Sequence, residues 1–363
     1  MRRGSEMNDD QVIQEKIDFV LTWVDGEDPE WLASKRNFSP DEISMNGVER
    51  YRDWDNLQYL FRGFETFTPW VNRIFFVTAG HLPEWLNTSH PKLTIVRHED
   101  FLDKDSLPVF NVNPIEINFH RIEGLSERFV YFNDDMFLLR PVKPSHFFRQ
   151  GLPVNAAISN IMYEGAISSI VLNDLELVNK NFNRHKGERK TKRGIIFSNF
   201  WKWFYPGYGI RVLDTLLLLR WKTFSGFANY HHPQPFLKET YKAVWRSEPD
   251  SMIRTSKSRF RSPTDVNQYL FRYWQFASGR FYPDSVKNAF KLRKYVELRT
   301  VEDVNAAAAE IESGKYQMYC LNDAMSKSRF TPRDATENEL EYSKTRIKTA
   351  LNSQLPKQSG FEI

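Results

Sequence analysis

Four short apolar runs in the first half of the chain predict β-strands that are buried on both faces. They are rich in Val, Ile and Phe, and apolar residues stand next to one another instead of alternating with polar ones. This pattern is typical of strands in a parallel sheet that helices cover on both sides. The runs are residues 17–24, 73–78, 93–96 and 129–132.

Between these runs, apolar residues recur every three or four positions, which predicts amphipathic helices. One helix carries Leu57, Leu60, Phe61 and Phe64, and another carries Ile115, Phe119 and Ile122. Asp53 or Asp55 is available to cap the first of them. Strands that alternate with helices form βαβ units, so we predict an α/β fold with a Rossmann-like, mostly parallel sheet flanked by helices.

Residues 151–230 break this alternation and are interpreted as a helical insertion. Seven Lys and Arg residues from Lys180 to Arg193 stand against one acid, Glu188, which gives this run a charge of +6. A dense group of aromatic residues follows at 197–208. We expect a basic, mobile loop beside a compact helical part that contacts either the acceptor or a membrane surface.

The rest of the chain returns to the earlier pattern. Residues 231–300 are predicted to be helical, 316–321 to form one more strand, and the polar tail from Pro332 to form at most a weak helix and to end loosely. The chain therefore divides into a disordered leader at 1–16, a Rossmann-like half at 17–150, the insertion at 151–230, a second segment at 231–330 that completes the site, and the tail at 331–363.

Composition and hydropathy exclude several classes of protein. With 41% hydrophobic and 26% charged residues, the chain can bury a core and is neither disordered, collagen-like nor a coiled coil. The single cysteine, Cys320, excludes an internal disulfide and a cysteine-based zinc site. A net charge of +4 is too small to indicate nucleic-acid binding. Because no run resembles a signal peptide or a membrane span, we expect a cytoplasmic protein, in contact at most with the inner face of the membrane.

Polar residues gather where three of the predicted strands end, at 22–26, 78–81 and 133–135. The carboxyl ends of parallel strands share one edge of a sheet, so we expect these residues on one rim. Adjacent carboxylates such as Asp134 and Asp135 commonly hold Mg²⁺ or Mn²⁺ against a diphosphate. An Asn-Asp-Asp run is also good turn chemistry, and position alone leaves both interpretations open.

Read together, these segments resemble the conserved blocks of the Stealth family. IDFVLTWVDG (17–26), 51–86 and 107–135 resemble the first three blocks, and HHPQPF (231–236), SRFRSPTD (258–265) and YCLND (319–323) resemble pieces of the fourth. The blocks occur in the family order, and the match is loosest at 155–230.

The resemblance implies the activity of a sugar-1-phosphate transferase on a fold like that of nucleotide-sugar transferases. Such an enzyme moves a hexose-1-phosphate, here expected to be N-acetylhexosamine-1-phosphate, from a UDP-sugar to a hydroxyl of a polysaccharide or oligosaccharide. A phosphodiester forms and UMP leaves. The implied setting is bacterial capsule or cell-surface polysaccharide synthesis, with Mg²⁺ or Mn²⁺ as cofactor, contact with the membrane or a capsule-assembly complex, and no nucleic-acid partner.

The family pattern also implies roles for individual residues. It implies catalysis by Asp134, Asp135, His231, Arg261 and Arg62, nucleotide binding by Thr22, Trp23, Asp25, Gly26, Asn133 and His120, and metal binding by Asp134, Asp135, Asn322 and Asp323. His231 is favoured over His232 because it stands two residues before Pro233.

Two other functions fit the same residues. A metal-dependent glycosyltransferase would also place acids after a strand, but it would attack the sugar carbon and release UDP instead of UMP. A non-catalytic glycan-binding protein would use the many aromatic residues to stack on sugar rings. The nucleotide that is released separates the first of these from phosphoryl transfer.

Overall fold

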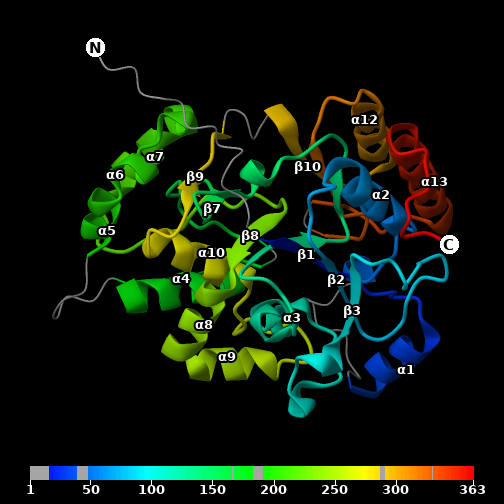
Figure 1. Cartoon of the computed structure of the whole chain (residues 1–363), viewed down its shortest axis with the longest axis horizontal. Helices are drawn as coiled ribbons and strands as arrows, with labels where there is room; N and C mark the ends of the chain where they lie inside the picture. Colours follow the sequence, from blue (N-terminus) through cyan, green and yellow to red (C-terminus); the bar gives the residue numbers. More distant parts are fainter. Residues whose placement is uncertain (1–15, 39–47, 166, 183–190, 287–290, 329) are drawn as a thin grey trace.

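The computed structural model describes residues 16–38, 48–165, 167–182, 191–286, 291–328 and 330–363. A five-stranded sheet lies at its centre (Figure 1). Its strand order is β3 (Leu93–Arg97), β2 (Ile74–Thr78), β1 (Ile17–Thr22), β4 (Arg128–Asn133) and β8 (Gln234–Leu237). The first four strands are parallel, as the sequence predicts, and β8 closes the edge antiparallel to β4.

Successive residues of β1 point into two different hydrophobic cores. Phe19 and Leu21 pack on one side with α2 (Leu57–Phe67), whereas Val20 packs on the other side. That second core includes α3 (Val112–Ile117), α4 (Ser168–Phe182), α8 (Lys238–Ser247), α9 (Pro249–Ser256) and α10 (Gln268–Ala277). Side chains of a strand alternate between its faces, so helices on both sides explain why the run is apolar throughout. The predicted α/β class is confirmed.

Two local expectations for the first helices are wrong. Asn56 is the N-cap of α2, and no side chain makes a capping hydrogen bond there. The Asp53 carboxylate instead accepts a hydrogen bond from the backbone N–H of Asp55. The pattern at 115–122 forms a short α3 followed by a 3₁₀ turn at Phe119–Arg121, because Asn118 interrupts the helix.

A second sheet stands beside the first. It contains β10 (Arg293–Leu298), β11 (Met318–Asp323) and β5 (Met136–Leu138), in that order. The strand predicted at 316–321 therefore exists, but it does not extend the central sheet. The segment 231–300 is not wholly helical either, since it supplies β8, β9 (Tyr282–Pro283) and β10 as well as the helices α8, α9 and α10.

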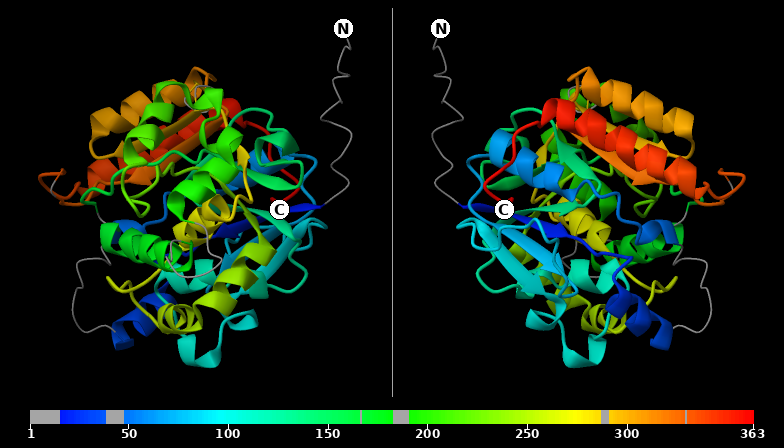
Figure 2. Two further views of the ribbon diagram at one scale, coloured as in Figure 1. Left: turned by 90° about the vertical axis from the view of Figure 1, so that its left-hand side faces the viewer. Right: turned by 90° about the vertical axis from the view of Figure 1, so that its right-hand side faces the viewer.

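The polar tail is part of the folded core and does not end loosely. α13 (Glu337–Gln354) lies against α12 (Val301–Glu312), and Figure 2 shows both helices (red and orange) together on one side of the molecule. Ile347, Leu351 and Phe361 are buried, and Glu362 forms a β-bridge with Leu86. The helical pattern is weak in sequence because only a narrow stripe of α13 is apolar.

The described part of the insertion lies at one end of the molecule (Figure 1) and contains β7 (Leu152–Asn155) and the helices α4, α5 (Lys192–Ser198), α6 (Phe200–Trp203) and α7 (Val212–Leu218). β7 forms a small sheet with β6 (Phe148–Arg149) and β9, which both lie outside residues 151–230. Most of the basic run lies outside the described residues. Of its described members, Lys180 pairs with Glu248, and the Lys192 ammonium donates to the carbonyls of Leu218 and Thr223.

Helix α1 (Pro29–Phe38) follows the loop after β1. Within the described ranges, none of the helices combines the length and the apolar character that a membrane span requires.

Candidate active site

The three strand ends singled out in the sequence meet on one rim of the central sheet. β1 lies between β2 and β4, and Thr22 stands opposite Asn133 in the parallel register. The backbone N–H of Asp25 donates to the His81 imidazole (N to Nε2, 2.8 Å), which joins the loop after β1 to the loop after β2. Parallel pairing alone places these groups together.

A cavity of about 150 Å³ opens at this rim. The residues of its wall that concern the chemistry are Thr22, Trp23, Arg50, Asn133, Asp134 and Arg261, which together define the rim pocket. The indole Nε1 of Trp23 and the Oδ1 of Asn133 are buried, and neither has a hydrogen-bond partner among the described residues. Buried polar atoms without partners are rare in folded proteins, so these two fit a ligand that supplies the missing hydrogen bonds.

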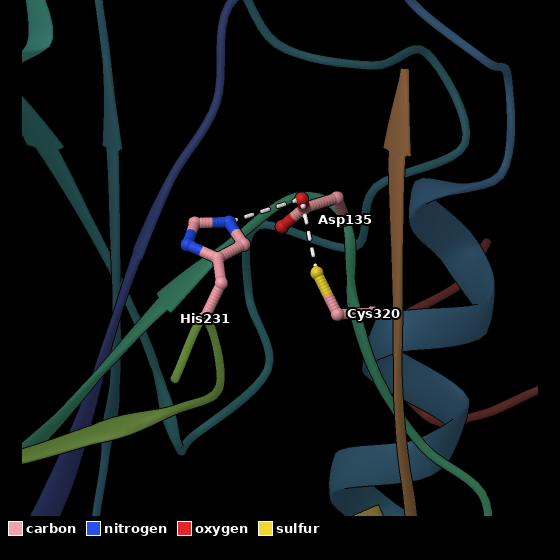
Figure 3. Close-up of side chains that lie close together, drawn as sticks. All are labelled: Asp135, His231 and Cys320. Carbon is pink, nitrogen blue, oxygen red and sulfur yellow. Dashed lines mark hydrogen bonds and ion pairs between the residues drawn. The ribbon is translucent and has the colours of Figure 1, made fainter. Parts of the chain in front are cut away.

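Asp135 forms the centre of a polar cluster next to the rim pocket (Figure 3). Its Oδ2 lies 3.2 Å from Nε2 of His231 and accepts a hydrogen bond from the Cys320 thiol at 3.1 Å. The three residues come from the turn after β4, the segment before β8, and β11. Segments far apart in sequence thus converge on one carboxylate.

Electrostatics in this cluster raise the pKa of His231 and of Asp134. Burial lowers the pKa of His231, but Asp135, with smaller contributions from Glu116 and Asp134, outweighs burial and raises it. Burial, followed by the charges of Asp135 and Asp53, raises the pKa of Asp134 to about 7. A cation beside Asp134 would relieve this repulsion and keep the Asp134 carboxylate ionised.

The oxygen atoms at the rim fit the Mg²⁺ or Mn²⁺ that the sequence predicts. The Oδ1 of Asp135 and the Oδ1 of Asn133 are both buried without a partner among the described residues, and hard cations prefer such oxygen ligands. Asp135, His231 and Cys320 also lie close enough together to hold an ion. Burial raises the pKa of the Cys320 thiol well above its usual value, and the thiol donates a hydrogen bond to Asp135. Mg²⁺ and Mn²⁺ prefer oxygen ligands to a soft sulfur.

Asp323, expected as a metal ligand, is engaged elsewhere. Its Oδ2 accepts hydrogen bonds from the Arg52 guanidinium at 2.6 Å and from the Trp54 indole at 3.1 Å. Its neighbour Asn322 stands on β11 opposite Glu297 of β10. The structure therefore gives Asp323 an ion pair that fixes the second sheet to the loop before α2.

Arg62, expected to be catalytic, anchors the C-terminus instead. Its guanidinium forms two hydrogen bonds with the Glu362 carboxylate, at 2.8 and 2.7 Å, and a third with the carbonyl of Leu355 at 2.9 Å. These contacts occupy its Nε, Nη1 and Nη2 and leave it buried. In sequence, an arginine that holds a buried carboxylate looks the same as one that binds phosphate, because the guanidinium fork suits both partners.

His120, expected to bind nucleotide, lies away from the rim. It occupies the 3₁₀ turn that precedes β4, and its ring packs beside Tyr241 and Trp245 of α8. The rim is at the opposite end of β4, six residues or roughly 17 Å further along the strand. Burial and nearby basic groups lower the pKa of His120 to about 4, so it is a neutral, half-buried histidine.

Gly26 and Asp25 shape the pocket without lining it. A Cβ at Gly26 would lie 1.8 Å from the carbonyl oxygen of Tyr51, so only glycine lets the loop after β1 approach Tyr51. Asp25 accepts a hydrogen bond from the backbone N–H of Glu27, which holds the same loop. Tyr51 in turn stands beside Arg50 in the pocket wall.

The structure separates the two adjacent histidines. His231 turns toward Asp135, whereas His232 lines a different cavity together with Arg272 and Arg293. Burial and these arginines lower the pKa of His232 to about 3. The structure places His231, the histidine that the sequence favours from its distance to Pro233, beside Asp135.

Sequence reasoning missed three groups beside the rim. Arg50 lines the rim pocket, and Asp53 raises the pKa of Asp134 through its charge. Glu116 of α3 is buried, and burial raises its pKa to about 7. Arg50 lies one position before the second Stealth-like block at 51–86, and the sequence indicates for Asp53 only a helix-capping role. For Glu116, the only indication in the sequence is a single glutamate within an apolar helix.

Comparisons with known proteins agree with the resemblance seen in the sequence. Residues 15–42 match Stealth protein CR1, conserved region 1, and residues 50–155 match Stealth protein CR2, conserved region 2. The receptor polysaccharide phosphotransferase WefC of Streptococcus oralis is 41% identical over 96% of this chain and 99% of its own length. This chain belongs to the Stealth family. The capsular polysaccharide phosphotransferase WcwK of Streptococcus pneumoniae is 37% identical, with 96% of this chain and 98% of its own length covered.

Family membership confirms that this Stealth protein is an enzyme of the phosphotransferase type, as expected from its sequence. The non-catalytic alternative is thereby excluded. Among solved structures, the galactosyltransferase LgtC is similar at 9% identity and a TM-score of 0.39, over 94% of this chain and 98% of that chain. That likeness is too distant to assign an activity.

Proposed function

We propose that the enzyme transfers a hexose-1-phosphate, such as N-acetylhexosamine-1-phosphate, from a UDP-sugar to a hydroxyl of a cell-surface polysaccharide. The observation that carries this proposal is the position of the His231–Asp135 pair directly beside the rim pocket, whose wall contains Asp134 and two arginines. Phosphoryl transfer depends on positioning and charge stabilisation, and these groups provide both. The relatives' names, which refer to receptor and capsular polysaccharides, support a glycan as the acceptor.

Each residue of the site has a part in the proposed reaction. Asp135 accepts the Nε2–H of His231 and so leaves Nδ1 to take the proton of the acceptor hydroxyl. Arg261, with Arg50, stabilises the charge on the phosphoryl group during transfer. Thr22, Trp23 and Asn133 hold the nucleotide end.

Asp134, Asp135 and Asn133 would hold the divalent cation. When bound, it would neutralise charge on the diphosphate. Neither Arg62 nor His120 takes part in the proposed reaction, and Asp323 supports the site through Arg52.

Identifying the released nucleotide tests the reaction type. Incubation with a UDP-sugar and a capsule fragment should release UMP and leave phosphate in the product, because the bond that breaks joins the bridging oxygen of the diphosphate to the transferred phosphorus. Release of UDP would instead establish the glycosyltransferase alternative. A panel of UDP-sugars in the same assay would identify the donor.

We also propose that the insertion docks the enzyme on an anionic membrane surface. On α7, Leu213, Leu216 and Leu217 stand at helical spacing and are exposed, Leu217 at 69%. Phe197, Phe200 and Trp201 form a second exposed stripe on α5 and α6. The apolar face of a helix normally packs against the core. Two exposed apolar helix faces therefore indicate a surface that binds a partner or a membrane.

Charge next to these two stripes favours lipid as the occupant. Arg193 and Lys222 are exposed at their edges, and the Arg220 guanidinium lies over the Trp221 ring, which is also exposed. Basic side chains beside Trp, Phe and Leu are the composition of helices that lie in an anionic lipid interface. Sedimentation with phosphatidylcholine vesicles that contain phosphatidylglycerol should recover the enzyme.

A double variant tests this surface. Leu216→Glu with Leu217→Glu should abolish sedimentation, whereas Ile253→Glu, which changes a similarly exposed residue of α9, should leave it unchanged. Binding that survives the double substitution, or that does not depend on phosphatidylglycerol, would contradict the proposal.

A further inference from the structure

A second, smaller cavity is lined by His232, whose neighbour His231 contacts Asp135. Its volume is about 30 Å³, enough for a small polar group and larger than one water requires. The residues of its wall used below are Asn155, His232, Gln234, Arg272, Asp284 and Arg293, which define the Arg272 pocket. They come from β7, β8, α10, β10 and adjoining turns, so the cavity lies where the small sheet meets the central one.

Arg272 brings an uncompensated positive charge to this pocket. Its side chain is 2% exposed, and its guanidinium donates to the amide oxygens of Asn155 and Asn229, each at 3.2 Å. Within the described part of the chain it forms no ion pair, and tyrosines are the groups that favour its charged form. A buried charge without a counter-ion is costly to the folded state, so an anion at this point would stabilise the protein.

The other charged groups of the pocket do not compensate the positive charge of Arg272. Arg293 pairs with Asp284 at 2.9 Å, so these two charges cancel. His146 and His232 also line the wall, and burial together with Arg293 lowers the pKa of each. Both histidines are therefore neutral near pH 7, and the net charge of the wall is the single positive charge of Arg272.

Hydrogen-bond donors in the same wall lack partners. The amide Nδ2 of Asn155 is buried and has no partner among the described residues. The His232 Nδ1 and the Gln234 Oε1 are also buried without a hydrogen-bond partner among the described residues. Donors and a cation suit an oxyanion, while the Gln234 oxygen suits a hydroxyl beside it.

We propose that the Arg272 pocket binds a small oxyanionic group, a carboxylate or a phosphate, carried by the acceptor glycan. Arg272 and the Asn155 amide would hold its oxygens, and Gln234 would accept a hydrogen bond from a neighbouring sugar hydroxyl. Because His231 and His232 are consecutive, a glycan whose anionic group occupies this pocket would be held next to His231, the proposed base. That the anion belongs to the acceptor rests on the proposed function, whereas the existence of the anion site does not.

Thermal unfolding of the full-length protein without any donor sugar tests the site itself. Sodium acetate and sodium phosphate are compared with sodium chloride at equal ionic strength. At tenfold the dissociation constant, the binding anion should raise Tm by roughly 2 °C above chloride. A rise with acetate identifies a carboxylate site and a rise with phosphate identifies a phosphate site. Equal Tm values in all three salts would overturn the proposal, whatever the assay of transfer shows.

Asn155→Asp provides the matched variant, because it places a fixed carboxylate beside Arg272 at almost unchanged volume. The variant should have a higher Tm in chloride than the native protein and should lose the shift with acetate or phosphate. Asn37→Asp adds the same charge at an exposed position of α1 and should retain the shift. If Asn155→Asp does not fold, Arg272→Met should still abolish the rise in Tm caused by acetate or phosphate. A folded variant of either kind that retains this rise would contradict the proposed anion site.

Discussion

At the scale of single residues, Asp135 has more partners than its place in a turn suggests. One oxygen contacts His231 and Cys320, and the other is buried and open to a ligand. From the sequence, the Asn-Asp-Asp run is a candidate because it follows a predicted strand, whereas His231 is a candidate only through the resemblance to the Stealth blocks. It could not show that Arg62 and Asp323 are already engaged, because their partners Glu362 and Arg52 lie hundreds of positions away along the chain.

Substitution of Asp135 should affect the rate far more than substitution of Cys320. Asp135→Asn removes the charge that orients His231 and should lower kcat for UMP release roughly a hundredfold. Cys320→Ala removes only a neutral donor and should lower kcat by less than about tenfold. Near-normal turnover of a folded Asp135→Asn variant would contradict the assignment.

Substitution of Arg62 should reduce stability and leave the chemistry intact. Arg62→Met leaves the buried Glu362 carboxylate without its ion-pair partner. This change should lower the free energy of unfolding by about 3 kcal/mol. Urea unfolding measures this loss, and kcat of the remaining folded enzyme should be nearly unchanged. Arg62→Met combined with Glu362→Leu should recover most of the stability. A large loss of kcat with normal stability would restore the catalytic role.

At the scale of elements, the four parallel strands of the central sheet are predictable from the sequence, whereas β10 of the second sheet is not. β1 and β2 are short apolar runs buried on both faces, and such runs are typical of strands inside a covered parallel sheet. β10 begins with Arg293 and Lys294 and is half-exposed, so it carries no such pattern. The 3₁₀ turn at Phe119–Arg121 shows the same limit, since its histidine belongs to the packing of α8 and not to the rim.

The pH dependence of stability tests the packing of that turn. The pKa of His120 is about 4 in the folded protein and about 6.5 when unfolded, so its contribution is complete above pH 6.5 and is lost as the pH falls toward 4. His120→Phe should therefore reduce the loss of stability between pH 7 and pH 5 by about 1–2 kcal/mol. Urea titrations at the two pH values measure the difference, and an unchanged difference would show that His120 is exposed to protons.

At the scale of the whole molecule, the C-terminal segment completes the fold. Phe361 is 1% exposed, and its ring contacts Phe61 of α2 at 5.3 Å and His90 at 3.7 Å between centroids. The last residues thereby cover the same face of the central sheet that α2 covers. In the sequence this segment resembles a polar tail, because its few apolar residues are isolated and form no periodic pattern.

Truncation of this ring should destabilise the whole enzyme. Phe361→Ala should lower the free energy of unfolding by about 3 kcal/mol, since it leaves a cavity beneath α2. Ile363→Ala, at an 81% exposed position two residues later, should change it by less than about 0.5 kcal/mol. Calorimetric Tm values of the two variants compare them directly, and similar values would show that the end of the chain is not part of the core.

The sequence by itself determines the class of the fold, the rim where three strands end, and the acids that follow the last of these strands. These follow from periodicity and from the rule that parallel strands present their carboxyl ends together, both of which are local or topological. Only the tertiary structure decides which charged groups remain available for chemistry. Arg62 and Asp323 are neutralised by partners from distant segments, while Arg272 is buried without one among the described residues, and pairing of this kind depends on distances that no pattern along the chain contains.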